Sequence, residues 1–382
     1  MSASAKDSSS SGLWFKDGTL VLRAGGSSFR IYGGFLADRS PAFRDILGLP
    51  ESKDAPQIDG CPVVELSDGE NDLRCFLKAL FDYDFFPPYP AKTDFATLSG
   101  IIRLSTKYRV ESLRQRALAH LSSAFPSDPT EFSPGSASWS LEGPEWLRVI
   151  LFAREMSLDW IIPLAFYRVC AFCTPAQILN GVDVVSHNPN HSTADDTDSN
   201  TTHIELNPAD KLMCIQQSIS LGKSASADIL NFLWEPASIP SCQRSSGSGG
   251  GGLTPDNASQ LSGRNNNWGA SDNGSLRSPT LDGVTGKWRC TQARFMLRKE
   301  AEAWRSSSSS NNSGSGSFPL TLFTPADFAQ LERDVCAGCM AAMRTAHQHA
   351  LDTFWDGLPR RFGLPGWKEL EEIKESVLEG PH

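Results

Sequence analysis

The sequence predicts an α+β protein, in which a domain of short strands and helices precedes a mainly α-helical C-terminal region. Three observations support this class. Residues 13–126 are dense in apolar positions and begin with two alternating stretches, a pattern typical of paired strands. After Trp139 the helical spacing of apolar residues takes over and strand patterns nearly vanish. Polar tracts rich in Ser, Gly and Asn interrupt this later part and predict disordered loops.

The first strands are predicted on either side of a glycine turn. Apolar residues alternate in "TLVLRA", residues 19–24, and again in "SFRIY", residues 28–32, with Gly25 and Gly26 between them. Because residues two apart share one face of a strand, the two stretches predict a pair of strands. A further short strand is predicted at residues 61–68, "CPVVELSD".

A pair of short helices is predicted after the second strand. Ser40 precedes Pro41, and a Ser at the cap followed by Pro at the first helical position is a typical helix start. This start separates two apolar clusters. We expect Phe35 and Leu36 to pack from one helix and Phe43 to pack from the next.

Three longer helices complete the N-terminal domain. Apolar residues recur at helical spacing over residues 73–81, 98–105 and 110–121. Ser67 and Glu70 have the spacing of a capping box before the first of these helices.

Helix starts also mark the C-terminal region. Apolar spacing predicts helices at residues 146–153 and 161–172. The similar sequences "TPAQ" at Thr174, "NPAD" at Asn207 and "TPAD" at Thr324 each combine a capping residue with Pro at the first helical position. They predict three more helix starts.

The low-complexity tracts divide the chain into segments. They contain too little apolar area to offset the entropy of ordering the backbone. The predicted organisation is a disordered N-terminus at 1–12, an α+β domain at 13–126, a helical region at 139–235, a disordered insert at 236–286, a helix at 287–305, a disordered linker at 306–317 and a helical C-terminal region at 318–382.

Charge and hydropathy limit the classes of partner. A net charge of -9 argues against broad binding to nucleic acid or to an anionic membrane surface. The start "MSASAKDSSSSG" has no apolar run of a secretory signal, and the longest apolar stretch, residues 160–166, is far below the roughly 20 residues that span a bilayer. We therefore expect an intracellular protein, in the cytoplasm or nucleus, whose 9 cysteines are free thiols.

The pattern of the first elements resembles the start of a BTB/POZ domain. Residues 17–47, "DGTLVLRAGGSSFRIYGGFLADRSPAFRDIL", contain a hairpin, a Leu-Ala-x-x-Ser signature at Leu36, Ala37 and Ser40, and a helix that opens at Ser-Pro. Four further stretches are similar to the BTB-domain proteins of large expanded families in mushroom-forming fungi: residues 63–90, 101–114, 153–170 and 336–367.

This resemblance implies a non-enzymatic protein-interaction scaffold. Relatives bind a second copy of themselves, another BTB protein, or a cullin, in the last case as adaptors for a cullin-type ubiquitin ligase. Many relatives carry a His and a basic residue after the second strand, and the basic residue helps to form a charged pocket between subunits. Here Tyr32 and Gly33 occupy these places.

Leu13, Trp14 and Phe15 are the candidate partner-binding residues, because three apolar side chains directly precede the first strand. They either form an exposed or swapped contact or cover the domain's own core. Two alternatives to the scaffold remain. One is a nuclear, transcription-associated regulator that acts through partners, since zinc-finger spacing and a basic helix are missing from the sequence. The other is a ligand-binding or catalytic helical domain.

Catalytic and cofactor motifs are weak. Ser, His and acidic residues do not fall into a recognisable triad, and His120 is interpreted as a surface or core residue. The glycines at 247, 249 and 252 match a dinucleotide-binding pattern by spacing alone, because they follow no predicted strand. We expect no catalytic residue and no cofactor.

A "CAGC" sequence at Cys336 and Cys339 is the most prominent metal pattern, with His347 downstream. His347 follows Cys339 by 8 residues, a rise of about 12 Å on one helix, whereas zinc ligands lie about 2.0 to 2.3 Å from the ion. A site with Cys242 and Cys290 in place of the histidine avoids this objection but requires two long loops to close. The favoured interpretation is buried free thiols without metal.

Overall fold

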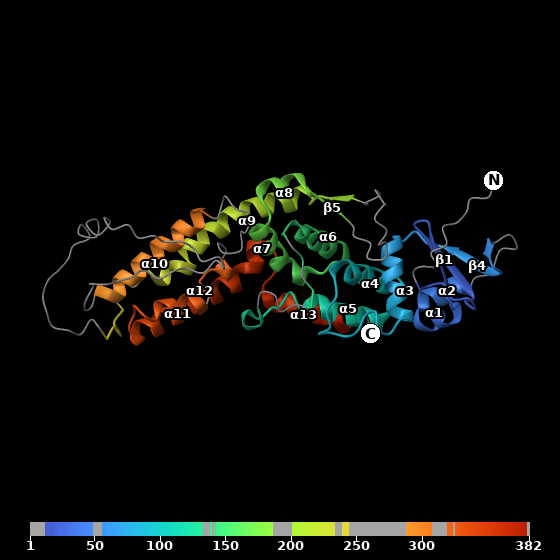
Figure 1. Ribbon diagram of the computed structural model, residues 1–382, viewed down its shortest axis with the longest axis horizontal. Helices are drawn as coiled ribbons and strands as arrows, with labels where there is room; N and C mark the ends of the chain where they lie inside the picture. Colours follow the sequence, from blue (N-terminus) through green and yellow to red (C-terminus); the bar gives the residue numbers. More distant parts are fainter. Residues whose placement is uncertain are drawn as a thin grey trace. The chain divides into compact units, whose positions relative to one another are not determined.

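The computed structural model describes residues 12–48, 56–132, 138–139, 141, 143–185, 201–233, 239–243, 288–307, 319–323 and 325–379 (Figure 1). It confirms the α+β class. The chain groups into two compact units. The N-terminal unit comprises the described residues within 1–165, 180–206 and 367–382, and the helical unit comprises those within 166–179 and 207–366.

A small four-stranded sheet begins the N-terminal unit. Strands β1 (Leu20–Ala24) and β2 (Ser27–Ile31) form the predicted antiparallel hairpin, and Gly25 and Gly26 turn the chain with φ of +56° and +91°. Glycine is favoured at these positive φ angles because it has no Cβ atom that would clash with the backbone.

The other two strands extend this sheet beyond the hairpin. Strand β4 (Cys61–Glu65) pairs with β1 in parallel, and β3 (Gln57–Ile58) pairs with β4 in antiparallel orientation, giving the order β2-β1-β4-β3. Strand β4 confirms the strand predicted in this part of the sequence. The parallel pairing brings residues more than thirty positions apart into one sheet.

Helices α1 (Gly33–Arg39) and α2 (Pro41–Leu47) form the predicted pair, and Ser40 is the residue that joins them. The Ser40 hydroxyl accepts a hydrogen bond from the Phe43 N–H at 3.1 Å, as the cap prediction requires, and it donates to the Tyr108 carbonyl at 2.5 Å. Leu36 and Phe43 are fully buried. Phe35 packs from α1 on the Phe81 ring at 5.0 Å, but it stays 38% exposed and is not part of the core.

Helices α3 (Glu70–Phe81), α4 (Phe95–Lys107) and α5 (Glu111–Ser122) agree with the predicted spacing and pack against one another. The capping-box prediction before α3 was wrong. Gly69 is the cap residue of that helix, so no side chain satisfies its first amides from that position. Helix α4, by contrast, has a side-chain cap: Asp94 accepts from the Thr97 N–H at 2.8 Å.

Several later segments complete the N-terminal unit. These are the short 3₁₀ turns η2 (Pro129–Glu131), η3 (Gly143–Glu145) and η4 (Asp159–Ile161), helix α6 (Trp146–Met156), the first residues of α7 (Ile162–Phe172), and helix α13 (Trp367–Glu379). The last helix contacts α5, where Arg114 donates to the Val377 carbonyl at 2.9 Å.

A second hairpin lies in the stretch that was predicted to be a helical region. Strands β5 (Val182–Val185) and β6 (Thr201–Ile204) pair in antiparallel orientation, and His203 Nδ1 lies 2.7 Å from Asp183 Oδ1 across the pair. Both strands are only 4 residues long and flank a polar tract, so they gave too short an alternating pattern to be recognised.

The helical unit is built from long helices and short turns. After the end of α7 these are α8 (Pro175–Asn180), α9 (Pro208–Ala227), η5 (Ile229–Leu233), α10 (Trp288–Ser307), η9 (Pro319–Thr321), α11 (Pro325–Leu331) and α12 (Ala337–Arg361). The short turn η5 contacts α9, α10 and α12 and so lies at their common core.

Two of the three predicted caps are confirmed by hydrogen bonds. Asn207 accepts from the Asp210 N–H at 2.9 Å at the start of α9. At the start of α8, the Gln177 N–H donates to Thr174 at 3.3 Å and the Gln177 side chain accepts from the Thr174 N–H at 2.8 Å. Thr324 lies outside the described residues.

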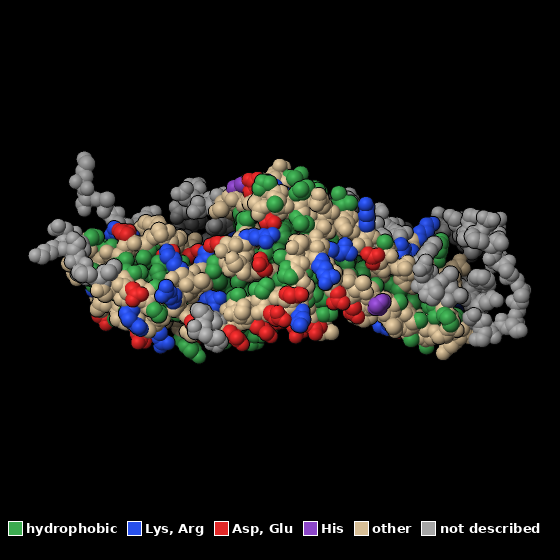
Figure 2. All heavy atoms as spheres, turned by 180° about the vertical axis from the view of Figure 1, so that it is seen from behind, with side chains coloured by type: hydrophobic (Ala, Val, Ile, Leu, Met, Phe, Trp, Pro, Cys, Tyr) green, Lys and Arg blue, Asp and Glu red, His purple; other side chains and the backbone are tan. Residues whose placement is uncertain are grey.

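The surface drawn in Figure 2 has mixed charge. Lys and Arg side chains alternate with Asp and Glu over the described part of this face, without a continuous basic area. Among the helices that the structure describes, none combines the length and the apolar character required to cross a membrane.

Candidate functional site

The predicted partner-binding residues line the open edge of the first hairpin. The Arg30 N–H donates to the Leu13 carbonyl at 3.0 Å, and the Phe15 N–H donates to the Arg30 carbonyl at 2.9 Å. Trp14 forms an isolated parallel bridge with Arg30. Leu13 is only 2% exposed and belongs to the core of the N-terminal unit. The chain therefore covers part of its own β2 edge with this segment.

Phe15 belongs to a group of four rings that we term the aromatic patch: Phe15, Tyr32, Phe35 and Phe81. The Phe15 centroid lies 4.9 Å from that of Tyr32 and 5.7 Å from that of Phe81, and Phe35 lies 5.0 Å from Phe81. Three of the rings are half-buried, whereas Phe35 is exposed. The patch joins the segment before β1 to α1 and the end of α3.

Polar groups border this patch. The Arg39 guanidinium lies 5.3 Å from the centre of the Phe35 ring, a cation–π distance. The Tyr32 hydroxyl donates to Asp17 at 2.7 Å, and this hydrogen bond raises the pKa of Tyr32. Apolar rings with a charged rim are a common composition for a protein-binding surface. Sequence reasoning identified Phe15 but assigned Phe35 and Phe81 to the core.

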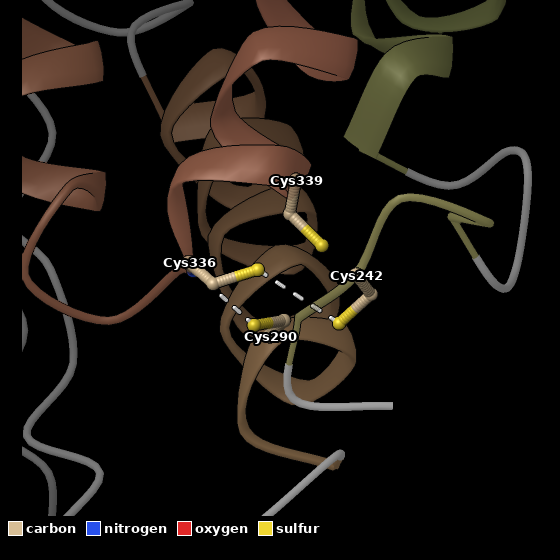
Figure 3. Close-up of side chains that lie close together, drawn as sticks. All are labelled: Cys242, Cys290, Cys336 and Cys339. Carbon is tan, nitrogen blue, oxygen red and sulfur yellow. Dashed lines mark hydrogen bonds between the residues drawn. The ribbon is translucent and has the colours of Figure 1, made fainter. Parts of the chain in front are cut away.

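The helical unit contains a second candidate site, which we term the cysteine cluster: Cys242, Cys290, Cys336 and Cys339. Their four sulfur atoms all lie within 4.8 Å of one another, and Figure 3 shows them gathered in one place. Cys242 lies in the segment 239–243, Cys290 in the first turn of α10, Cys336 at the cap of α12 and Cys339 in its first turn. All four side chains are buried.

The distances in the cysteine cluster exclude disulfide bonds in this structure. The Cys336 and Cys242 sulfurs are 3.9 Å apart, nearly twice the length of about 2.05 Å of an S–S bond. All nine cysteines of the chain, each within the described residues, are free thiols. These four cysteines are buried free thiols, as the sequence interpretation had them, and the fold also brings their sulfurs to one point.

Backbone amides point at the sulfurs. The Cys336 N–H donates to the Cys290 sulfur at 3.3 Å. Burial raises the pKa of Cys336, but amides of Cys339 and Gln243 that donate to its sulfur outweigh burial, and the pKa falls to about 6. Burial raises the pKa of Cys339 and Cys290. The local amides therefore favour negative charge on one sulfur of the cluster.

The segments that carry the cluster are fastened to one another beside it. Ser241 donates through its hydroxyl to the Gly338 carbonyl at 3.1 Å, which joins the Cys242 segment to the "CAGC" turn. A Cβ atom at Gly338 would lie only 2.1 Å from the Ser241 carbonyl oxygen, so this approach requires glycine. The Arg289 guanidinium lies 3.1 Å from the Asp334 carboxylate and joins the start of α10 to the chain before α12.

A buried cation lies beside the cluster. Arg294 follows Cys290 by one helical turn on α10, and it is only 2% exposed. Burial lowers the pKa of Arg294, whereas Cys339, Cys290 and Cys242 act in the opposite direction through their negative charge when ionised. The positive charge of Arg294 is thus within electrostatic reach of three of the four sulfurs.

His347 takes no part in the cysteine cluster, as the helical spacing predicts. Its ring packs among Phe232, Phe323 and Phe328, with centroid distances of 5.0, 5.9 and 5.3 Å. Burial lowers the pKa of His347, so the ring is neutral at pH 7. His347 is a core residue of the helical unit.

His120 is likewise a core residue, which confirms one of the two structural roles expected from the sequence. Its Nδ1 lies 3.0 Å from the Ser138 hydroxyl and its Nε2 lies 3.0 Å from the Pro87 carbonyl. Burial lowers the pKa of His120. Both ring nitrogens have structural partners, so neither is left to act on a substrate.

Comparison with known proteins adds no identification. No protein-family model matches the chain, and no curated protein matches its sequence at a significant level.

Proposed function

We propose that the chain is a protein-interaction scaffold of the BTB/POZ type. The observation that carries this proposal is the succession of elements in the N-terminal unit: a hairpin, two short helices joined at Ser40, a strand that returns to β1, and then α3 to α5. The hairpin and the two short helices are the elements that the resemblance of residues 17–47 implies. The helices that follow are tied to these elements: Ser40 donates to the carbonyl of Tyr108 at the end of α4, and Arg74 of α3 lies 5.6 Å from the centre of the Phe29 ring of β2.

The aromatic patch is the surface that we assign to binding. The exposed Phe35 ring packs on the half-buried Phe81 ring, so it offers apolar area at little entropic cost. The patch includes Tyr32, next to the place where dimeric relatives form their charged pocket between subunits. We therefore propose that a second copy of this chain, or another BTB protein, is the partner, with apolar contacts in place of the charged pocket.

Light scattering after gel filtration of the full chain tests this assignment. We expect a dimer that dissociates at least about tenfold more readily in Phe35→Glu, because a carboxylate would be buried against the partner. Tyr83→Glu is the matched control, since Tyr83 is 88% exposed and lies outside the patch. It should leave the dimer unchanged.

Three outcomes would count against this proposal or parts of it. A monomeric wild-type chain that also fails to bind other BTB proteins would contradict pairing through the patch. If that monomer binds a purified cullin, and Phe35→Glu does not weaken the binding, the adaptor function stands and the assigned surface is wrong. A chain that binds none of these proteins contradicts the scaffold itself.

A further inference from the structure

We propose that the cysteine cluster binds one Zn²⁺ ion as a closed structural site. This inference is independent of the proposed scaffold function, because it rests on residues of the helical unit alone. Cys242, Cys290, Cys336 and Cys339 would supply all four ligands.

The separation of the sulfurs fits a single tetrahedral ion. With Zn–S bonds of about 2.3 Å, the sulfurs of a tetrahedral site lie about 3.8 Å apart. The Cys336 and Cys242 sulfurs are 3.9 Å apart, and no pair in the cluster exceeds 4.8 Å. Closing the wider pairs onto an ion therefore requires side-chain shifts of about an ångström, without a change of backbone.

The ligand set indicates the ion and its role. Four thiolates in tetrahedral arrangement are typical of zinc, and soft sulfur ligands disfavour magnesium and calcium. Four protein ligands leave no open position for water or substrate, so the site is structural. All four sulfurs would bind as thiolates, so each thiol that still carries a proton releases it to solvent as one Zn²⁺ enters, without any change of oxidation state.

The surroundings of the cluster suit the resulting charge. Zinc with four thiolates carries a net charge of −2, which is costly to bury without compensation. The Cys336 N–H already donates to a ligand sulfur at 3.3 Å, in the manner of outer groups that orient metal ligands. Arg294 is buried and within electrostatic reach of three of the sulfurs, so its positive charge offsets part of this negative charge.

The site would tie together parts of the chain that are far apart in sequence. Cys242 and Cys290 are 48 residues apart, and Cys290 and Cys336 are 46 residues apart. Closing loops of this length costs entropy that a metal bond offsets. The ion would thus hold the starts of α10 and α12 to the segment 239–243, between the low-complexity inserts.

Metal analysis of the purified full chain, isolated without a metal-affinity column, tests the proposal. Plasma mass spectrometry should find about one zinc per chain, and the double variant Cys290→Ser/Cys339→Ser should lose at least nine tenths of it. Cys170→Ser/Cys214→Ser is the matched control, because these two thiols are also buried in the helical unit but lie outside the cluster. This control should retain the zinc.

A second measurement avoids variants that fail to fold. Exchange of the wild-type chain with Co²⁺ should produce the visible absorption bands of a tetrahedral thiolate complex, and native mass spectrometry should show one bound divalent ion in place of two hydrogens. Wild-type chain that contains no zinc after purification and takes up none from added Zn²⁺ would overturn the proposal. So would one iron per chain in place of zinc, or a mass two hydrogens lower for each disulfide formed among the four cysteines.

Discussion

The hairpin core of the N-terminal unit and the cysteine cluster of the helical unit bring distant parts of the chain together by different physical means. In the first, fully buried apolar residues such as Leu22, Phe29 and Phe43 come from elements close in sequence. In the second, four thiols and the buried Arg294 converge from segments separated by long inserts. Burial of apolar area is sufficient for a compact local fold, whereas the inserts impose a closure entropy that calls for a stronger, directional bond.

Removal of metal should have the largest effect, and it should destabilise the cysteine cluster without destabilising the N-terminal hairpin core. Structural zinc contributes on the order of 10 kcal/mol to the folding of small sites. Treatment of the zinc-bound chain with a strong chelator should therefore speed amide hydrogen exchange at the starts of α10 and α12 by orders of magnitude, while β1, β2 and α2 keep their protection. Hydrogen exchange with mass spectrometry resolves these segments within one sample.

The N-terminal strands and α2 are the internal control for this experiment. Equal loss of protection in both regions would show that the chelator acts on the whole chain. Unchanged exchange at α10 and α12 after complete zinc removal would show that apolar packing alone holds the helical unit, and the contrast between the two regions would fail.

One substitution should strongly destabilise the apolar core of the N-terminal unit, and a substitution on the neighbouring helix serves as its control. Phe43 and Phe35 lie on neighbouring helices, but Phe43 is fully buried and stacks on Tyr108 at 4.2 Å, whereas Phe35 is 38% exposed. Phe43→Ala should lower the free energy of unfolding by about 3 to 5 kcal/mol, because it leaves a cavity. Phe35→Ala should cost less than about 1 kcal/mol.

Urea unfolding followed by circular dichroism measures both variants. If both variants lower the free energy of unfolding by similar amounts, Phe35 contributes to stability as a core residue does, which would contradict its assignment to a binding surface. Neither variant should change the zinc content, since both residues belong to the N-terminal unit.

Local sequence patterns predicted the N-terminal unit well because its determinants are neighbours in the chain. The hairpin follows from alternation around Gly25 and Gly26, and the start of α2 follows from the side chain of Ser40. Exposure of Phe35 was not predictable in this way. Helical spacing indicates which residues share a face, but it does not tell how much of that face a short helix covers.

The cysteine cluster was predictable only in part. The "CAGC" spacing identified Cys336 and Cys339, because residues three apart lie on one face of a helix turn. Cys242 and Cys290 have no local pattern that indicates a common centre. Their convergence depends on the packing of α10 against the start of α12, which includes the Arg289–Asp334 ion pair, and such tertiary contacts leave no periodic trace in a single sequence.

Gly338 allows the test with the smallest expected effect on the cysteine cluster, because helix α12 contains a second glycine, Gly357, that serves as its control. A Cβ at Gly338 would lie 2.1 Å from the Ser241 carbonyl oxygen, a backbone atom that cannot rotate away. Among the described residues, nothing lies within 4 Å of a Cβ at Gly357. Gly338→Ala should lower the free energy of unfolding by roughly 2 kcal/mol and weaken zinc retention against a chelator.

Gly357→Ala should act in the opposite direction. Alanine is favoured over glycine within a helix by about 1 kcal/mol, and the added methyl group meets only open space. Thermal unfolding and the rate of zinc loss to a chelator, measured on both variants, distinguish a clash at the cluster from a general effect on α12. If Gly338→Ala retains zinc as well as Gly357→Ala does, the close approach of Ser241 is not required for the site. The contact between the segment 239–243 and the start of α12 would then not explain how the helical unit differs from the N-terminal unit.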